Sequence, residues 1–167
     1  VSATDAETGD CFSFKTKAVV NATGVFADDI LQMDKPGSSK TVCVSQGIHL
    51  VVDKKFFPSE AALMIPKTSD GRVLFVVPWH GKLLIGTTDT AVETASLEPV
   101  ALQKEVDFIL ETAGQYLVQK PVAADVLSVF AGQRPLAAPG EGSQKTKEIS
   151  RSHKIVVSAS NLFTMLG

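Results

Sequence analysis

Two side chains in this sequence have the chemistry that an active site needs. His49 lies in the apolar run 48–52, and its imidazole can accept or donate a proton near neutral pH. Arg134 precedes Pro135, which restricts it to extended backbone and gives its side chain a defined direction. Its planar guanidinium can hold a carboxylate or a phosphate through two parallel hydrogen bonds. Both also have a structural interpretation: a lone strand histidine is more often a hydrogen-bonded structural residue, and the arginine can cap a sheet edge or pair with an acid such as Asp89.

The polar segment Gly86-Thr87-Thr88-Asp89 is a third candidate. It ends the stretch 72–89, in which the apolar runs 73–77 and 83–85 flank Pro78-Trp79-His80-Gly81. Because Val, Ile and Phe favour strands and Pro and Gly favour a reversal, we predict a β-hairpin there. The five apolar residues of its first arm predict a central strand that is covered on both faces. Gly86–Asp89 then either borders a site or caps the next turn.

A glycine turn near the start is a weaker candidate for ligand binding. The strand-like run 17–22 closes on Thr23 and Gly24, and the apolar spacing of 25–33 is compatible with a short helix. A strand, a glycine turn and a helix in succession place backbone N–H groups where a phosphate or a cofactor edge can sit. Any tight strand-to-helix junction needs such a turn, so this pattern alone does not establish a cofactor.

The elements that would position these residues indicate an α+β fold. Short apolar runs joined by polar, Gly-containing loops predict a mixed, largely antiparallel β-sheet. Apolar residues three and four apart predict one long helix over 98–119, with Pro99 in its first turn, beside the short helix near the start. A buried strand over 126–132 should end just before Arg134. Residues 140–147 are polar and Gly-rich and should form a loop.

The composition is that of a globular protein and excludes several function classes. The chain has 167 residues, 44% hydrophobic and 20% charged, and a net charge of −2, which gives no basic footprint for nucleic acid. No apolar run approaches the roughly 18 residues of a membrane-spanning helix, and the start lacks the basic segment of a signal peptide. Cys11 and Cys43 lie in separate strand-like runs without metal-ligand spacing, so we expect reduced thiols and no metal.

Five segments together resemble a known family. KAVVNATG, SQGIHLVV, VLFVVPWHGKLLIGTTDT, VFAGQRPL and SRSHKIVVSASNLFTMLG occur in an order that resembles the FAD-dependent glycerol-3-phosphate dehydrogenases, which belong to the wider D-amino-acid-oxidase-like flavoproteins. The resemblance covers essentially the whole chain. It implies an oxidoreductase that converts sn-glycerol 3-phosphate to dihydroxyacetone phosphate by hydride transfer to FAD.

The resemblance also implies roles for individual residues. Ala22, Thr23 and Gly24 resemble a turn that contacts FAD, and Gly167 resembles the first glycine of a second such turn. His49 resembles the histidine that lies over the flavin and positions the substrate or removes its hydroxyl proton. Arg134, in the Gly-x-Arg-Pro-Leu pattern, resembles the arginine that binds the substrate. These implications make His49 and Arg134 the expected catalytic and substrate-binding pair.

The sequence also departs from the complete family pattern. It has no Gly-x-Gly-x-x-Gly segment, so the main pyrophosphate site of a dinucleotide domain is missing. We therefore expect an internal part of a longer enzyme that is inactive by itself. The resemblance assigns 1–24 to the edge of the FAD-binding domain, 25–160 to a substrate-binding domain, and 161–167 to a strand that returns to the FAD domain.

Alternatives remain at this point. A guanidinium binds carboxylate as well as phosphate, so a related FAD oxidoreductase acting on an amino acid or a 2-hydroxy acid is possible, as is a non-catalytic binding module. The expected partners are a phosphorylated small molecule and, for the parent enzyme, quinone or another electron acceptor. We expect no nucleic acid partner. The family resemblance favours a cytoplasmic protein, or one peripheral at the inner face of the membrane through parts of the parent enzyme.

Overall fold

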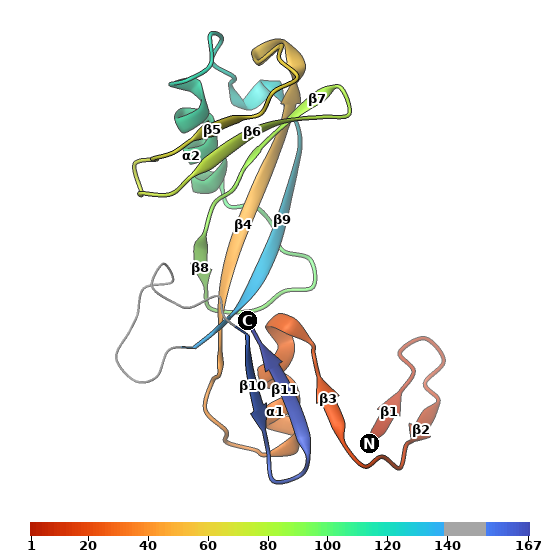
Figure 1. The fold of residues 1–167 in the computed structure, drawn as a ribbon. Coiled ribbons are helices and arrows are strands. Elements are labelled where there is room, and N and C mark those ends of the chain that lie inside the picture. Colours follow the sequence, from red (N-terminus) through yellow and green to blue (C-terminus); the bar gives the residue numbers. More distant parts are fainter. Residues whose placement is uncertain (139–152) are drawn as a thin grey trace.

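The computed structural model describes residues 1–138 and 153–167, which form an elongated molecule with two parts (Figure 1). The larger part, here called the upper unit, is a six-stranded sheet with helix α2 (Gln103–Gly114) on one face. The smaller part, the lower unit, is a three-stranded sheet with helix α1 (Ala27–Asp34). Two long strands, β4 (Val42–Asp53) and β9 (Val126–Ala137), run side by side from the upper unit down to the lower one. The predicted mixed α+β fold with largely antiparallel strands is confirmed.

The bounds of the elements are as follows. The upper unit contains β4 (Val42–Asp53), η2 (Lys54–Phe56), β5 (Leu63–Ile65), β6 (Leu74–Trp79), β7 (Lys82–Gly86), β8 (Thr90–Val92), α2 (Gln103–Gly114), η3 (Ala123–Asp125) and β9 (Val126–Ala137). The lower unit contains β3 (Val19–Asn21), η1 (Gly24–Phe26), α1 (Ala27–Asp34), β10 (Lys154–Val157) and β11 (Leu162–Leu166). A hairpin of β1 (Ser2–Thr4) and β2 (Cys11–Ser13) precedes them. The loop predicted at 140–147 lies outside the described residues.

Strand β4 organises the upper unit. It pairs with β9 along one edge, and with β7 and then β8 along the other, all antiparallel. Its buried side chains Ile48, Leu50 and Val52 alternate along the strand and pack in one core with Ile109 and Ala113 of α2. One face of β4 is therefore covered by α2, and the residues between, which include the expected catalytic His49, project from the other face.

The hairpin predicted within 72–89 is present as β6 and β7. Its reversal is shorter than expected, because only His80 and Gly81 form the turn, both with positive φ (45° and 72°). The prediction that its first arm is covered on both faces is wrong. Leu74 and Val76 are buried, but Phe75 between them is 44% exposed, because α2 covers a single face of this sheet.

The long helix is shorter than predicted. It spans Gln103–Gly114 rather than 98–119, and Pro99 lies before it instead of in its first turn. Glu105 fixes the start, because its carboxylate accepts the backbone N–H of Leu102 at 2.9 Å as an N-terminal cap. The apolar spacing continues to Leu117, which does reach the core, but from a turn after the helix.

Arg134 lies inside a strand rather than after one, as the sequence had suggested. Strand β9 continues through Pro135, which lies opposite Val44 of β4. Proline is tolerated here because β9 is an edge strand of the described sheet, where a missing N–H group interrupts no central ladder. The expected burial of this strand is also wrong in part, since Leu127 and Phe130 are exposed.

The lower unit is built on one parallel pair of strands. β11 runs parallel to β3, and β10 pairs antiparallel with β11 on its other side. The short helix expected over 25–33 is present as η1 and α1, and Ala27, Val42 and Leu166 form a small buried cluster beside it. Asn21 ties the unit together, because its amide donates to the Ala27 carbonyl at 2.9 Å and to the hydroxyl of Thr164 at 3.4 Å.

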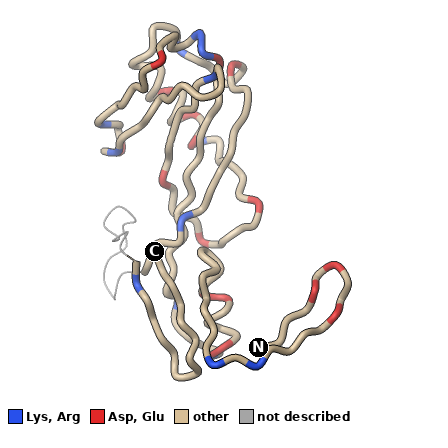
Figure 2. The backbone as a smooth tube through the Cα atoms, turned by 45° about the vertical axis from the view of Figure 1, so that its right-hand side comes forward, with Lys and Arg blue, Asp and Glu red and all other residues tan. Residues whose placement is uncertain are grey.

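Charge is unevenly distributed over the chain. Figure 2 shows acidic residues at the tip of the hairpin that extends from the lower unit, which carries Asp5, Glu7 and Asp10. Lys and Arg occur in both units. In the ranges 1–138 and 153–167, no helix has the length and apolar character needed to cross a membrane.

Candidate functional site

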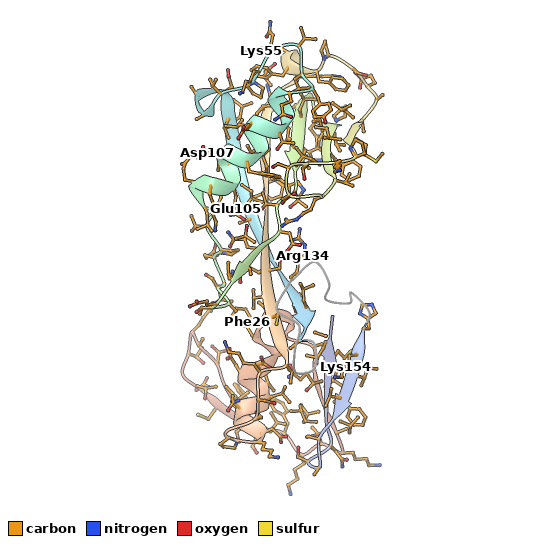
Figure 3. The ribbon with its side chains drawn as sticks, turned by 90° about the vertical axis from the view of Figure 1, so that its left-hand side faces the viewer. Phe26, Lys55, Glu105, Asp107, Arg134 and Lys154 are labelled. Atoms are coloured by element: carbon orange, nitrogen blue, oxygen red, sulfur yellow. The ribbon has the colours of Figure 1, made fainter. Side chains whose placement is uncertain are left out.

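His49 and Arg134 project from the same face of the upper sheet. Arg134 lies opposite Ser45 in the β4–β9 ladder, and Ser45, Gly47 and His49 alternate along one face of β4. This is the face that α2 leaves uncovered. Figure 3 shows Arg134 near the middle of the molecule, between Glu105 above it and Phe26 below. The structure thus brings together the two residues that the sequence singled out, from adjacent strands.

Two glycines give these side chains room to lie flat against the sheet. A Cβ on Gly47 would lie 2.3 Å from Nη2 of Arg134, and a Cβ on Gly86 would lie 2.2 Å from Cδ2 of His49. Any other residue at either position would displace the functional side chain. The sequence interpretation overlooked Gly47, although a glycine inside a buried strand run signals a close approach of this kind.

The guanidinium of Arg134 is held by neutral oxygens. Nη1 donates to the carbonyl of Thr88 and Nη2 donates to the hydroxyl of Thr87, each at 3.3 Å. The expected structural alternative, a pair with Asp89, is not formed. The Asp89 carboxylate accepts the hydroxyl of Ser45 and lies 4.0 Å from Arg72, whose Nη2 also donates to the Asp89 carbonyl at 2.7 Å.

The half-buried guanidinium of Arg134 can bind an anion. No acidic side chain within 1–138 or 153–167 forms an ion pair with Arg134. Five N–H groups belong to a guanidinium, and the two contacts above are long for bonds from a charged donor. The remaining N–H groups can hold a carboxylate or a phosphate at this face of the sheet.

His49 is arranged to be uncharged near neutral pH. Partial burial, with a smaller contribution from the nearby Arg134 cation, lowers the pKa of its imidazole below the usual value near 6.5. Its ring stacks on Phe130, with centroids 5.2 Å apart and planes inclined by 14°. A neutral imidazole fixed by stacking can accept a proton from a bound hydroxyl group. Phe130 was not predicted to belong to the site, because its contact with His49 depends on the pairing of β9 with β4.

His49 lies in a row of cross-strand neighbours that includes three apolar side chains. From β5 to β9, the row consists of Met64, Phe75, Gly86, His49 and Phe130. Met64, Phe75 and Phe130 are all exposed in the described structure. The face is open, so the described residues form an exposed platform around His49. A hollow of about 750 Å³ near α1 and β8 is lined by neither His49 nor Arg134.

The residues expected to contact FAD lie in the lower unit, at one edge. Asn21 and Thr164 are register partners in the parallel pair of β3 and β11, and Gly24 and Gly167 each follow three residues later. The carboxyl ends of parallel strands are where nucleotide cofactors bind in open sheets. Both glycines have positive φ (63° and 111°), and nothing lies within 4 Å of a Cβ placed on Gly24. The turn formed by Ala22, Thr23 and Gly24 therefore fits a close approach of backbone to a cofactor.

Comparisons with known proteins show the family of this chain. The family model described as FAD dependent oxidoreductase matches residues 2–166. The chain is 38% identical over 170 residues to a probable mitochondrial glycerol-3-phosphate dehydrogenase of Dictyostelium discoideum, covering 98% of this chain and 26% of that protein. It is 39% identical over 160 residues to the mitochondrial glycerol-3-phosphate dehydrogenase of Arabidopsis thaliana, covering 96% of this chain and 25% of that protein.

Solved structures show the same fold. The glycerol-3-phosphate dehydrogenase of Bacillus halodurans, determined in complex with FAD, matches with a TM-score of 0.80 and 33% identity over 98% of this chain and 30% of that chain. The iminodiacetate oxidase of Chelativorans matches with a TM-score of 0.56 and 15% identity, over 95% of this chain and 38% of the oxidase chain, which shows a shared fold alone. This chain thus spans about a quarter of the curated relatives above, and it belongs to the FAD-dependent oxidoreductase family.

Proposed function

We propose that the protein containing this chain oxidises sn-glycerol 3-phosphate to dihydroxyacetone phosphate with FAD as cofactor. The two curated relatives named above are a probable and a named glycerol-3-phosphate dehydrogenase, and the solved structure that matches with a TM-score of 0.80 is a glycerol-3-phosphate dehydrogenase in complex with FAD. The observation that carries the proposal is that His49, whose pKa is lowered by burial, and Arg134, which has no acidic partner among the described residues, project from one open face. The family match argues against a non-catalytic binding module.

Each side chain has one task in this proposal. Arg134 binds the phosphate of the substrate through the N–H groups that Thr87 and Thr88 leave free. His49 accepts the proton of the C2 hydroxyl at an imidazole nitrogen, which its lowered pKa keeps unprotonated. Phe130 orients the imidazole by stacking. FAD would be contacted by Ala22, Thr23, Gly24 and Gly167, and it supplies the acceptor for the C2 hydride when bound.

The test compares substrates and one variant in the full-length protein. We expect turnover with sn-glycerol 3-phosphate and little with glycine or lactate at the same concentration. Arg134→Lys should raise KM for sn-glycerol 3-phosphate, because an ammonium group cannot replace a two-pronged fork. KM for glycerol, which has no anionic group, should change little and serves as the control. Faster turnover of glycine or lactate would replace the proposed substrate, and unchanged KM and kcat would remove Arg134 from the site.

The wider setting of the enzyme is also a proposal. We assign 1–24 and 161–167 to the edge of an FAD-binding domain and 25–160 to the substrate-binding domain. Quinone or another acceptor would reoxidise the flavin. The proposed compartment is the cytoplasm, or the inner face of a membrane through other parts of the enzyme. The names of the two curated relatives above include "mitochondrial", so fractionation of cells that express the tagged full-length protein is the direct measurement.

A further inference from the structure

Thr88 contacts Arg134 on one side of the sheet and a buried acid on the other. Its carbonyl accepts Nη1 of Arg134 at 3.3 Å, and its hydroxyl donates to Oε1 of Glu105 at 2.9 Å. The same hydroxyl oxygen accepts the backbone N–H of Ile48 at 3.0 Å, at the point where β4 changes partner from β7 to β8. One residue thus connects the proposed anion site to helix α2.

Glu105 is a fixed anchor for this connection. Glu105 is 2% exposed. Its Oε2 accepts hydrogen bonds from the backbone N–H of Leu102 and from Nε2 of Gln46, both at 2.9 Å. Burial alone would raise the pKa of its carboxyl group, but hydrogen bonds from Leu102, Thr90, Gln46 and Thr88 together lower it below the ordinary value. The carboxylate therefore stays ionised and can accept four hydrogen bonds.

Capping of α2 does not account for all of these contacts. The cap uses the Leu102 N–H and Oε2, whereas Oε1 is directed to Thr88 in the loop between β7 and β8. Burying a carboxylate without a cation is costly, and within the described ranges Glu105 forms no ion pair. A neutral Gln at this position would also cap the helix. The charge strengthens the bond to Thr88, as hydrogen bonds to ionised acceptors are stronger than neutral ones.

The orientation of Arg134 depends on this loop. Both of its described contacts are to Thr87 and Thr88, and both are long. Gly47 lets the guanidinium lie against β4 but offers no side chain that could hold it there. A guanidinium that binds an anion in a two-pronged manner must be held at one angle, so a loose loop would weaken binding without removing the charge.

We propose that Thr88 and Glu105 are positioning residues, which hold the guanidinium of Arg134 at the angle in which it binds the substrate anion. This inference rests on the proposed function of Arg134. Glu105 acts from the opposite face of the sheet, through the hydroxyl of Thr88, and touches neither substrate nor cofactor. Figure 3 shows Glu105 of α2 above Arg134 of β9, and Asp107, which is also in α2, above Glu105.

The test uses the full-length holoenzyme with sn-glycerol 3-phosphate. Thr88→Val removes the hydroxyl at nearly constant volume, and we expect KM to rise roughly tenfold, the equivalent of one lost charge-assisted hydrogen bond. kcat should stay within about twofold and the FAD content should not change. Thr88→Ser keeps the hydroxyl and should restore KM. Glu105→Gln, of equal size, should raise KM by a smaller factor and covers the case in which Thr88→Val does not fold.

Two matched controls separate positioning from general damage. Thr112→Val makes the same change at a different buried threonine, which lies in α2 rather than in the loop of Thr88. Asp107→Asn removes a carboxylate from the exposed side of α2. Neither should change KM. An equal rise of KM in Thr112→Val and Thr88→Val would overturn the proposal.

A double-mutant cycle decides whether the effect passes through Arg134. In an Arg134→Ala background, Thr88→Val should raise KM no further, because the group that it positions is gone. A further tenfold rise would mean that Thr88 acts independently of Arg134 and would overturn the positioning role. If Arg134→Ala alone leaves KM unchanged, the proposed function of Arg134 fails and this inference fails with it. If Arg134→Ala raises KM while Thr88→Val and Glu105→Gln do not, only the positioning role fails.

Discussion

The upper and lower units differ in how they hold their candidate site residues in place. In the upper unit, thirteen buried hydrophobic residues form one core between the sheet and α2, and a buried carboxylate supports the loop beneath Arg134. In the lower unit, the described core is a cluster of three buried residues, and the turn with Gly24 is fixed mainly through Asn21. The upper unit fixes side chains by packing, whereas the lower unit offers backbone at a strand edge.

This difference suggests a division of tasks within the enzyme. Substrate chemistry needs side chains held at defined angles, and a dense core with satisfied polar contacts provides that. The cofactor contact that we propose for the lower unit needs only a close approach of backbone, for which glycines with positive φ are sufficient. The consequences of mutation should therefore differ between the units in both size and kind.

The largest expected effect concerns the chain studied alone. Residues 1–167 should fold, because the core of the upper unit is complete within them, but they should not retain FAD. Two glycine turns at the lower edge cannot offset the entropy lost in immobilising a large dinucleotide. The measurement is flavin absorbance in the protein peak after gel filtration of chain mixed with FAD. Stoichiometric yellow protein would show that the lower unit holds a complete cofactor site.

A second expectation compares the two cores directly. Leu50→Ala removes a side chain that is fully buried between sheet and helix, and should reduce the free energy of unfolding by about 3–5 kcal/mol. Leu166→Ala, at a residue that is 3% exposed in the smaller cluster, should cost about 2–3 kcal/mol because fewer neighbours line the cavity. Denaturant titration of both variants gives the two values. Equal losses would mean that the lower unit is as tightly packed as the upper.

A third expectation uses one substitution in both units. Gly47→Ala places a methyl group against the guanidinium of Arg134 and should raise KM for the substrate in the full-length enzyme, with FAD content unchanged. Gly24→Ala meets no neighbouring atom but forces a positive φ on alanine, at a cost of about 1–2 kcal/mol, and should lower FAD content. Parallel measurement of KM and bound flavin tests the division of tasks. A Gly47→Ala variant that loses flavin would contradict it.

The sequence predicted which helices and strands form in both units better than it predicted where they end and which of their side chains are exposed. Local apolar runs and Gly-containing turns were sufficient for the β6–β7 hairpin and for β11, because these depend on neighbouring residues. The start of α2 was missed because it is fixed by Glu105, whose carboxylate caps the helix and also bonds residues distant in sequence. Arg134 was placed after a strand because the proline that follows it suggests a break, whereas an edge strand tolerates it.

The candidate site was predictable only in part for a related reason. His49 and Arg134 could be selected as chemically capable residues, and the structure places them on one face. Their roles remain predictions. Phe130 could not be found, because its stacking on His49 depends on the register between the distant strands β4 and β9. Thr88 was selected with the segment Gly86–Asp89, but its hydrogen bonds to Arg134 and Glu105 could not be predicted, because they join residues that are distant in sequence. Gly47 carried a signal, a glycine within a strand, that points to close approach.

The smallest expected effect is a shift in the pH dependence of kcat/KM. His49 must be neutral to accept a proton, so activity should fall as pH falls through its pKa. Burial is the main cause that lowers this pKa, and the Arg134 cation adds to it by disfavouring a second positive charge nearby. Arg134→Gln removes that cation while burial remains. The pKa of His49 should then rise, and the acidic limb of the profile should move to higher pH.

A matched control shows whether this shift is local. Lys82→Gln also removes one positive charge, but Lys82 pairs with Asp53 at the far end of β7 and does not contribute to the pKa of His49. Its acidic limb should coincide with that of the wild type. A shift of equal size in both variants would reflect net charge rather than the Arg134–His49 pair. A shift to lower pH in Arg134→Gln would contradict the sign expected for a cation beside an imidazole, and would separate the two residues that the upper unit brings to one face.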